Sequence, residues 1–160
     1  MSEGSGALAG WTAVVAGMAA VIWWPLATDQ AAGPWVLAAF VLVHGLVHLL
    51  FAVPPPGGEG EGAWPFDMTR SWAGAGSEAA RGLVRGIGWI LVAATILTAV
   101  LGALATVDVA VPTAWWGPAV AGSAVASAIT LVLFFSPQLA LGIAIDAGLI
   151  WVAVSGVWVP

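Results

Sequence analysis

The chain has no cysteine and no lysine, and only 7% of its 160 residues are charged. The lack of cysteine excludes disulfide bonds, thiolate metal sites and cysteine nucleophiles. A soluble domain usually carries about 25% charged residues, so these few charges cannot solvate the surface of a globular domain. Because 61% of the residues are apolar, we expect a lipid bilayer to surround most of the chain.

Basic residues are scarce as well, at three against eight acidic ones, so no basic stripe exists and nucleic-acid binding is excluded. The three are Arg70, Arg81 and Arg85, which lie in or beside a single loop. The positive-inside rule therefore predicts a cytoplasmic position for the loop 54–80. We interpret the three arginines as topology anchors in a cytoplasmic membrane, with the N-terminus inside and the C-terminus outside.

Catalytic motifs are missing too. The sequence has no Walker A loop, no GxSxG elbow and no dinucleotide fingerprint, and its Gly-rich stretch at 57–62 is acidic and would repel phosphate. The two histidines are four residues apart, but the Glu of a zincin HExxH motif is absent. The sequence thus favours a protein without catalytic residues.

What the chain has in abundance is long apolar runs. A membrane-spanning helix needs roughly 20 such residues, and the runs predict five spans, at about 7–26, 34–53, 82–106, 114–135 and 138–157. Met1 to Gly6 lacks the positive charge of a signal peptide, so we expect the first run to be retained. Ser136 and Pro137 divide the last run, as a cap and a first-turn residue. The alternative is four spans, because a membrane helix tolerates an internal proline.

The predicted fold is therefore an all-α polytopic transmembrane helix bundle, with residues 1–160 forming a single transmembrane domain. Under the five-span arrangement most tryptophans fall into two interfacial belts, with Trp115 and Trp116 at the outer face. The loop 54–80 is rich in Pro and Gly at its start. Ser77 and Glu78 near its end are typical of a helix N-terminus, so the third helix is expected to begin near Glu78. Asp67 and Arg70, three residues apart, predict an ion pair in the loop.

Four polar residues inside the predicted spans carry the candidate site. His44 and His48 share one face of the second span, and Ser127 and Asp146 lie in the fourth and fifth. At about 1.5 Å per residue, His44, Ser127 and Asp146 are roughly 12 to 15 Å from the inner end of their spans. Because ionisable groups inside a membrane are costly, we predict that these residues form an intramembrane polar cluster.

Several chemistries fit that cluster. His44, His48 and Asp146 supply ligand types for a divalent metal, and either histidine is a potential haem ligand. A His–Asp pair can also relay protons, as in pumps and transporters. Equally, hydrogen bonds among these groups can simply hold helices together, at roughly 1 kcal/mol or less each.

The chain also resembles a group of small prokaryotic multi-pass membrane proteins without assigned activity. The resemblance depends on three stretches, His44-Gly45-Leu46-Val47-His48, Gly88-Trp89-Ile90-Leu91 and 136–146, which starts at Ser136-Pro137 and ends at Asp146. It implies a bundle of four or five helices in which His44, Gly45, His48 and Asp146 belong together. Ser136 stands where the group usually has Trp.

The function expected from the sequence is that of a structural or accessory subunit, or scaffold, of a membrane complex. Other membrane subunits or a second copy of the chain are the expected partners besides lipid. The alternatives are a small transporter or proton-coupled carrier that uses the His/Asp cluster, and a metal- or haem-binding membrane protein.

Overall fold

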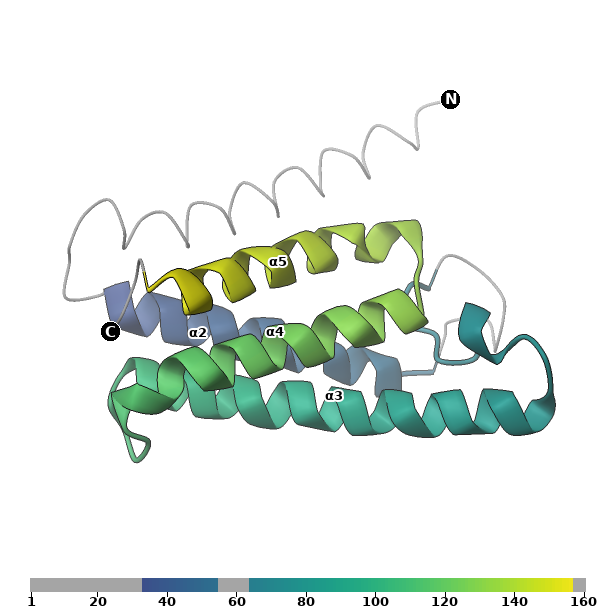
Figure 1. Ribbon diagram of the computed structural model, residues 1–160, viewed down its shortest axis with the longest axis horizontal. Coiled ribbons are helices and arrows are strands. Elements are labelled where there is room, and N and C mark those ends of the chain that lie inside the picture. Colours follow the sequence, from purple (N-terminus) through teal and green to yellow (C-terminus); the bar gives the residue numbers. More distant parts are fainter. Residues whose placement is uncertain (1–32, 55–63, 157–160) are drawn as a thin grey trace, which may run out of the picture.

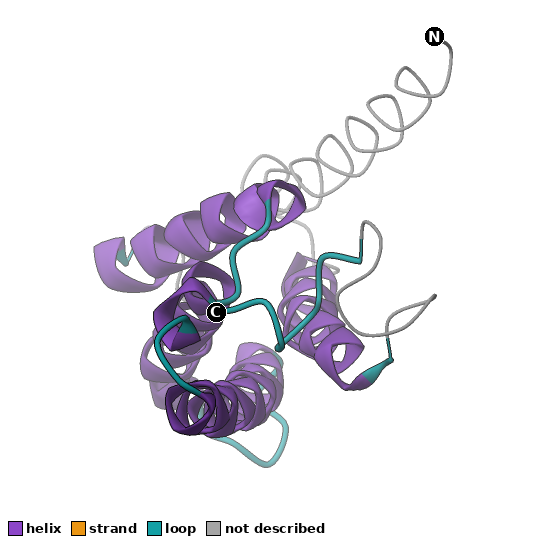
Figure 2. Ribbon diagram, turned by 90° about the vertical axis from the view of Figure 1, so that its right-hand side faces the viewer, coloured by secondary structure: helices purple, strands orange, loops and turns teal. Residues whose placement is uncertain are grey.

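The computed structural model of the protein describes residues 33–54 and 64–156, and every regular element within these ranges is a helix (Figures 1 and 2). Four of the described helices are long and apolar enough to cross a membrane. The elements are α2 (Gly33–Leu46), which continues into the 3-10 helix η1 (Val47–Ala52), then η2 (Trp72–Gly74), α3 (Glu78–Thr106), η3 (Thr113–Trp115), α4 (Trp116–Leu133), η4 (Pro137–Leu139) and α5 (Ala140–Ser155). The prediction of an all-α membrane helix bundle is confirmed.

The described spans run over Gly33–Ala52, Glu78–Thr106, Thr113–Leu133 and Pro137–Ser155, and each overlaps a predicted one. The described residues thus contain four spans, the number expected in the four-span alternative. The predicted span at about 7–26 lies outside the described residues.

The chain turns sharply between α4 and α5, which lie side by side and antiparallel in Figure 1. Pro137 occupies the first turn of η4, where its missing N–H costs no hydrogen bond. The predicted capping role of Ser136 is wrong, because its side chain makes no cap hydrogen bond and its Oγ is buried without a partner among the described residues. Instead, the Leu139 N–H donates to the backbone oxygen of Ser136 at 2.9 Å, which closes the turn through the main chain.

The start of α3 matches the expectation from its capping residues. Ser77 has an extended backbone, and its Oγ accepts a hydrogen bond from the Ala80 N–H at 3.1 Å. Glu78 lies in the first turn, where a carboxylate interacts favourably with the positive end of the helix dipole.

Replacing Ser77 with Ala is therefore expected to lower the free energy of unfolding by about 1 kcal/mol, the usual value of an N-cap hydrogen bond. Thermal melts in detergent would measure the effect, with Ser155→Ala at the far end of α5 as the matched exposed control. Equal melting temperatures for the two variants would show that the cap contributes nothing.

The helices approach closely because glycine faces a neighbour at each crossing. A Cβ added to Gly45 would lie 2.3 Å from Ala99 Cβ, and one added to Gly102 would lie 2.9 Å from Val120 Cγ2. Small residues allow such backbone approach in lipid, where helix association depends on packing. As a result α2 packs on α3, α3 on α4, and α4 on α5.

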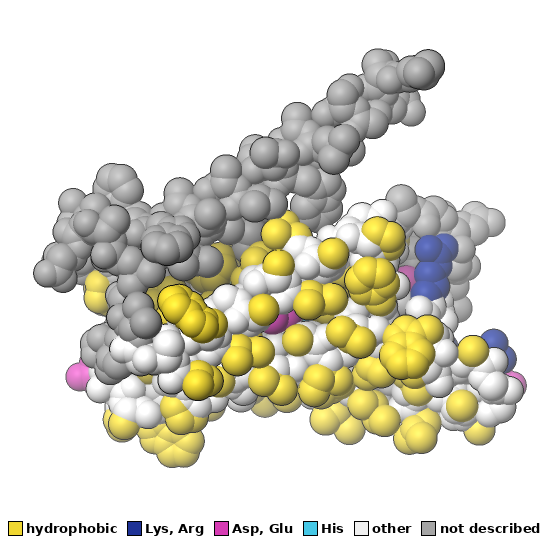
Figure 3. Space-filling view, turned by 45° about the horizontal axis from the view of Figure 1, so that its top comes forward, with side chains coloured by type: hydrophobic (Ala, Val, Ile, Leu, Met, Phe, Trp, Pro, Cys, Tyr) yellow, Lys and Arg dark blue, Asp and Glu magenta, His cyan; other side chains and the backbone are white. Residues whose placement is uncertain are grey.

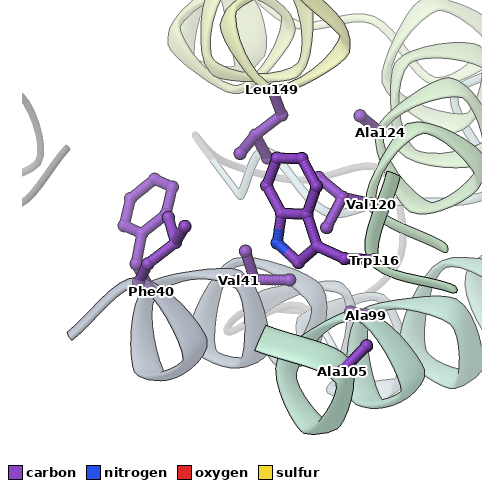
Figure 4. Packing of buried hydrophobic residues seen from close by; sticks show 9 residues of the cluster. Phe40, Val41, Ala99, Ala105, Trp116, Val120, Ala124 and Leu149 are labelled. Atoms are coloured by element: carbon purple, nitrogen blue, oxygen red, sulfur yellow. The ribbon is translucent and has the colours of Figure 1, made fainter. Parts of the chain in front are cut away.

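Trp116 lies in the bundle interior at the start of α4 and is only 3% exposed. Figure 4 shows its indole between Val41 of α2 and Leu149 of α5. Its neighbour Trp115 is 58% exposed. Consecutive helical residues point about 100° apart, so when one of an adjacent pair faces outward the other can face the core.

Apolar side chains also cover the outside of the bundle. Ile90, Leu97 and Val154 are 65 to 76% exposed, and the face in Figure 3 shows hydrophobic side chains along the helices, with the basic ones gathered at one end. A water-soluble monomer rarely exposes so much contiguous apolar surface. The protein is therefore a membrane protein whose outer surface contacts the lipid bilayer.

The described end of the long loop is bound to the end of α4. Ser71 Oγ donates to the Leu133 carbonyl at 2.8 Å, and Trp72 Nε1 donates to the Val132 carbonyl at 2.7 Å. These bonds satisfy carbonyls that a helix end leaves without intrahelical partners. Asp67 forms the predicted ion pair with Arg70, with 3.5 Å between the carboxylate and the guanidinium nitrogen. The Pro/Gly-rich segment 55–63 lies outside the described residues.

Candidate functional site

The structure brings the four predicted cluster residues into direct contact. His44 comes from α2, His48 from η1, Ser127 from α4 and Asp146 from α5. His44 is 7% exposed and His48 2%, and Ser127 and Asp146 are completely buried. Residues 102 positions apart in the sequence thus meet inside the membrane-spanning part of the bundle.

The four side chains form one continuous hydrogen-bonded chain. Asp146 Oδ1 lies 2.7 Å from His44 Nε2, and Asp146 Oδ2 lies 2.7 Å from Ser127 Oγ. Ser127 Oγ also lies 3.0 Å from His48 Nε2, and His48 Nδ1 donates to the His44 carbonyl oxygen at 3.3 Å. Both oxygens of the carboxyl group therefore have a partner, as burial of such a group requires.

A change of helix type positions His48. The α-helical turns of α2 end at Leu46, and the chain continues as the tighter 3-10 helix η1. Carbonyls at the end of an α-helix lose their regular partners, and the His44 carbonyl is instead bound by the His48 side chain. No proline marks the end of the α-helical part, so the sequence does not predict this change.

Gly45 positions the same segment against α3. The absence of a side chain there lets the α2 backbone reach Ala99, and a Cβ at Gly45 would also lie 3.6 Å from the Thr95 carbonyl oxygen. The histidines on either side are thereby held at a fixed height against their partners on α4 and α5. The glycine that follows His44 is thus needed for the close packing of α2 against α3.

The hydrogen bonds fix one proton of His48. The His44 carbonyl can only accept, so His48 Nδ1 must carry a hydrogen. Two arrangements of the remaining protons then satisfy every contact and leave the cluster without net charge. In the first, Asp146 is ionised and accepts from His44 Nε2–H and from the Ser127 hydroxyl, while His48 is a cation whose Nε2–H donates to Ser127 Oγ.

In the second arrangement all four groups are neutral. Asp146 carries a proton on Oδ2 and donates it to Ser127 Oγ, and the Ser127 hydroxyl donates to His48 Nε2. His44 Nε2–H donates to the carbonyl oxygen Oδ1 as before. The cluster has no net charge in either arrangement, which reduces the cost of burying it in hydrocarbon.

The predicted metal ligands are engaged in these hydrogen bonds. Nε2 of both imidazoles and Nδ1 of His48 each have a partner. Within the described ranges, no group of three His, Asp or Glu side chains is arranged to hold a metal ion. Metal or haem binding at His44, His48 and Asp146 stays a prediction, which elemental analysis and an absorption spectrum of the purified protein would test.

The predicted topology anchors lie apart from the cluster. Arg81 and Arg85 are exposed in the first turns of α3, and Arg70 is in the loop that precedes it. Basic side chains are seen only at one end of the bundle in the face of Figure 3. They do not contribute to the candidate site.

Comparison of the chain with protein-family models, with curated proteins and with solved structures gave no match. The interpretation of the cluster therefore depends on its geometry.

Proposed function

We propose that the protein is a small proton-coupled membrane carrier and that the His44–Asp146–Ser127–His48 cluster is its proton-binding site. One observation carries this proposal. The two proton arrangements of the cluster use the same heavy-atom positions and differ only in where the hydrogens lie. A proton can therefore change place without any movement of the helices.

The transfer needs two hydrogen shifts. His48 Nε2 gives its proton to Ser127 Oγ across 3.0 Å, while Ser127 gives its own hydroxyl proton to Asp146 Oδ2 across 2.7 Å. The imidazolium and the carboxylate both become neutral, and Ser127 is a hydroxyl before and after. Histidine suits this role because its ordinary pKa lies near physiological pH.

A purely structural role accounts less well for the composition of the cluster. Hydrogen bonds between membrane helices contribute roughly 1 kcal/mol or less, and serine and threonine can supply them without ionisable groups. Two imidazoles and a carboxyl group add a desolvation cost that such a role does not require. The scaffold role and its partner subunits stay predictions, which gentle purification with any bound subunits would test.

Replacing Ser127 with Ala is expected to interrupt the relay. Liposomes containing the variant should acidify, under a potassium diffusion potential, no faster than protein-free liposomes, whereas wild-type liposomes acidify faster. Ser123→Ala is the matched control, because Ser123 is also buried on α4 but donates to the backbone oxygen of Thr95 at 3.0 Å. Equal proton flux through both variants would contradict the relay.

The orientation is part of the proposal. We expect the loop 54–80, with its neighbouring arginines, to face the cytoplasm. Because the chain has no cysteine, a single Gly76→Cys substitution gives one exposed thiol in this loop. A membrane-impermeant maleimide should label it in inverted vesicles and not in intact cells. Labelling of intact cells would reverse the assigned topology.

A further inference from the structure

The described residues form a half-open cavity of about 700 Å³ beside the cluster. Its walls come from α2 and η1 on one side and from the α5 region on the other, and they are almost entirely apolar. Val36, Val43, Phe66, Leu139, Gly142 and Ile145 are among the lining residues. The polar side chains His44, His48 and Gln138 also line it.

One ring nitrogen of His44 has no hydrogen-bond partner among the described residues. Within the described chain, the His44 imidazole makes a single hydrogen bond, from Nε2 to Asp146 at 2.7 Å. Nε2 carries its hydrogen in both proton arrangements, so Nδ1 holds a lone pair and can only accept. The residue is 7% exposed and lines the cavity. Nδ1 is therefore an acceptor without a donor among the described residues.

We propose that the cavity binds a lipid-soluble molecule with an apolar body and a hydroxyl head group, and that the hydroxyl donates to His44 Nδ1. A volume of about 700 Å³ lies within the usual range for small-molecule pockets, which are largely apolar with few polar groups that orient the ligand. This inference builds on the proposed carrier function by naming its substrate class. The binding itself does not require proton transfer.

Ligand binding in the cavity is also coupled to the position of the proton in the cluster. A hydroxyl that donates to Nδ1 polarises the imidazole, so Nε2–H becomes a stronger donor to Asp146. A stronger donor favours the ionised carboxylate over the protonated one. Ligand binding and protonation of Asp146 therefore oppose each other, as coupling between a substrate and a proton requires.

A matched pair of ligands tests the hydroxyl requirement without a proton gradient. para-Nonylphenol and its methyl ether have nearly the same apolar body, but only the phenol has a hydrogen to donate. Equilibrium binding to the purified full-length protein in detergent should give one site, with the phenol bound about three to ten times more tightly, the effect of one net hydrogen bond.

Two tryptophan variants locate the site. Val43→Trp fills the cavity from its α2 wall and should abolish binding of both compounds. Val154→Trp places the same side chain at a position on α5 that is 76% exposed, and it should leave binding unchanged. Both variants keep all four cluster residues. Thermal melting of each variant would show whether the bundle still folds.

Equal affinity for the phenol and the ether, with displacement of both by phospholipid, would identify an acyl-chain site and overturn the inference. Retention of binding in Val43→Trp would do the same, because the compounds would then occupy another place. Tight, hydroxyl-dependent binding together with a Ser127→Ala variant that still conducts protons would overturn the carrier proposal alone.

Discussion

Replacing Asp146 with Asn is expected to abolish proton flux through the reconstituted protein while leaving its fold intact. The amide keeps an oxygen that accepts from His44 Nε2–H and gains an N–H₂ that donates to Ser127 Oγ, so both contacts of the native carboxyl group are retained. It cannot take up a proton near neutral pH. Flux under a diffusion potential should therefore fall to that of protein-free liposomes.

Asp146→Leu separates this effect from loss of structure. Leucine removes both acceptors and leaves His44 Nε2–H unsatisfied in the bundle interior, at a cost of about 1 to 3 kcal/mol. The Ser127 hydroxyl can still donate to His48 Nε2. The melting temperature should thus fall for Asp146→Leu and stay near that of the wild type for Asp146→Asn. Wild-type flux through Asp146→Asn would show that this carboxyl group carries no proton.

Adding one methyl group at Gly45 is expected to destabilise the bundle and to disable the site together. The Cβ of Gly45→Ala would lie 2.3 Å from Ala99 Cβ, so α2 must move away from α3. Overpacking of this kind costs roughly 1 to 3 kcal/mol. The shift also moves His44 and His48 away from their partners on α4 and α5, so proton flux should fall with the melting temperature.

Removing the opposing methyl group provides the rescue. The double variant Gly45→Ala with Ala99→Gly restores the space. Its free energy of unfolding should exceed the value expected from the sum of the two single effects by a coupling of about 0.5 to 3 kcal/mol. Gly148→Ala is the control, because a Cβ there would meet no atom within 4 Å. Additive effects of the two substitutions would mean that the close approach of α2 and α3 does not constrain the site.

The sequence was sufficient to predict which residues form the cluster, but not how they bond. The depths of His44, Ser127 and Asp146 follow from the fixed rise of a helix and from the ends of the apolar runs. Their contacts depend on which helices are neighbours. That neighbourhood is set by close packing at residues such as Gly45 and Gly102, and one sequence rich in glycine and alanine does not show which glycines face a partner.

Local features that depend on tertiary contacts were also missed. The 3-10 helix η1 begins without a sequence signal, and the His44 carbonyl that it releases is bound by a side chain four residues later. The burial of Trp116 was missed as well, because it depends on packing against α2 and α5. In contrast, the start of α3 was predicted correctly, because Ser77 and Glu78 act within one turn.

Infrared difference spectroscopy of the protein in lipid bilayers, recorded between high and low pH, would follow the proton on Asp146 itself. Proton relay by the cluster predicts a carboxylic acid C=O band that appears on acidification, shifts in heavy water and is absent from Asp146→Asn. A wild-type spectrum that shows only carboxylate bands for this residue at every pH would contradict it, because Asp146 would then never receive the proton.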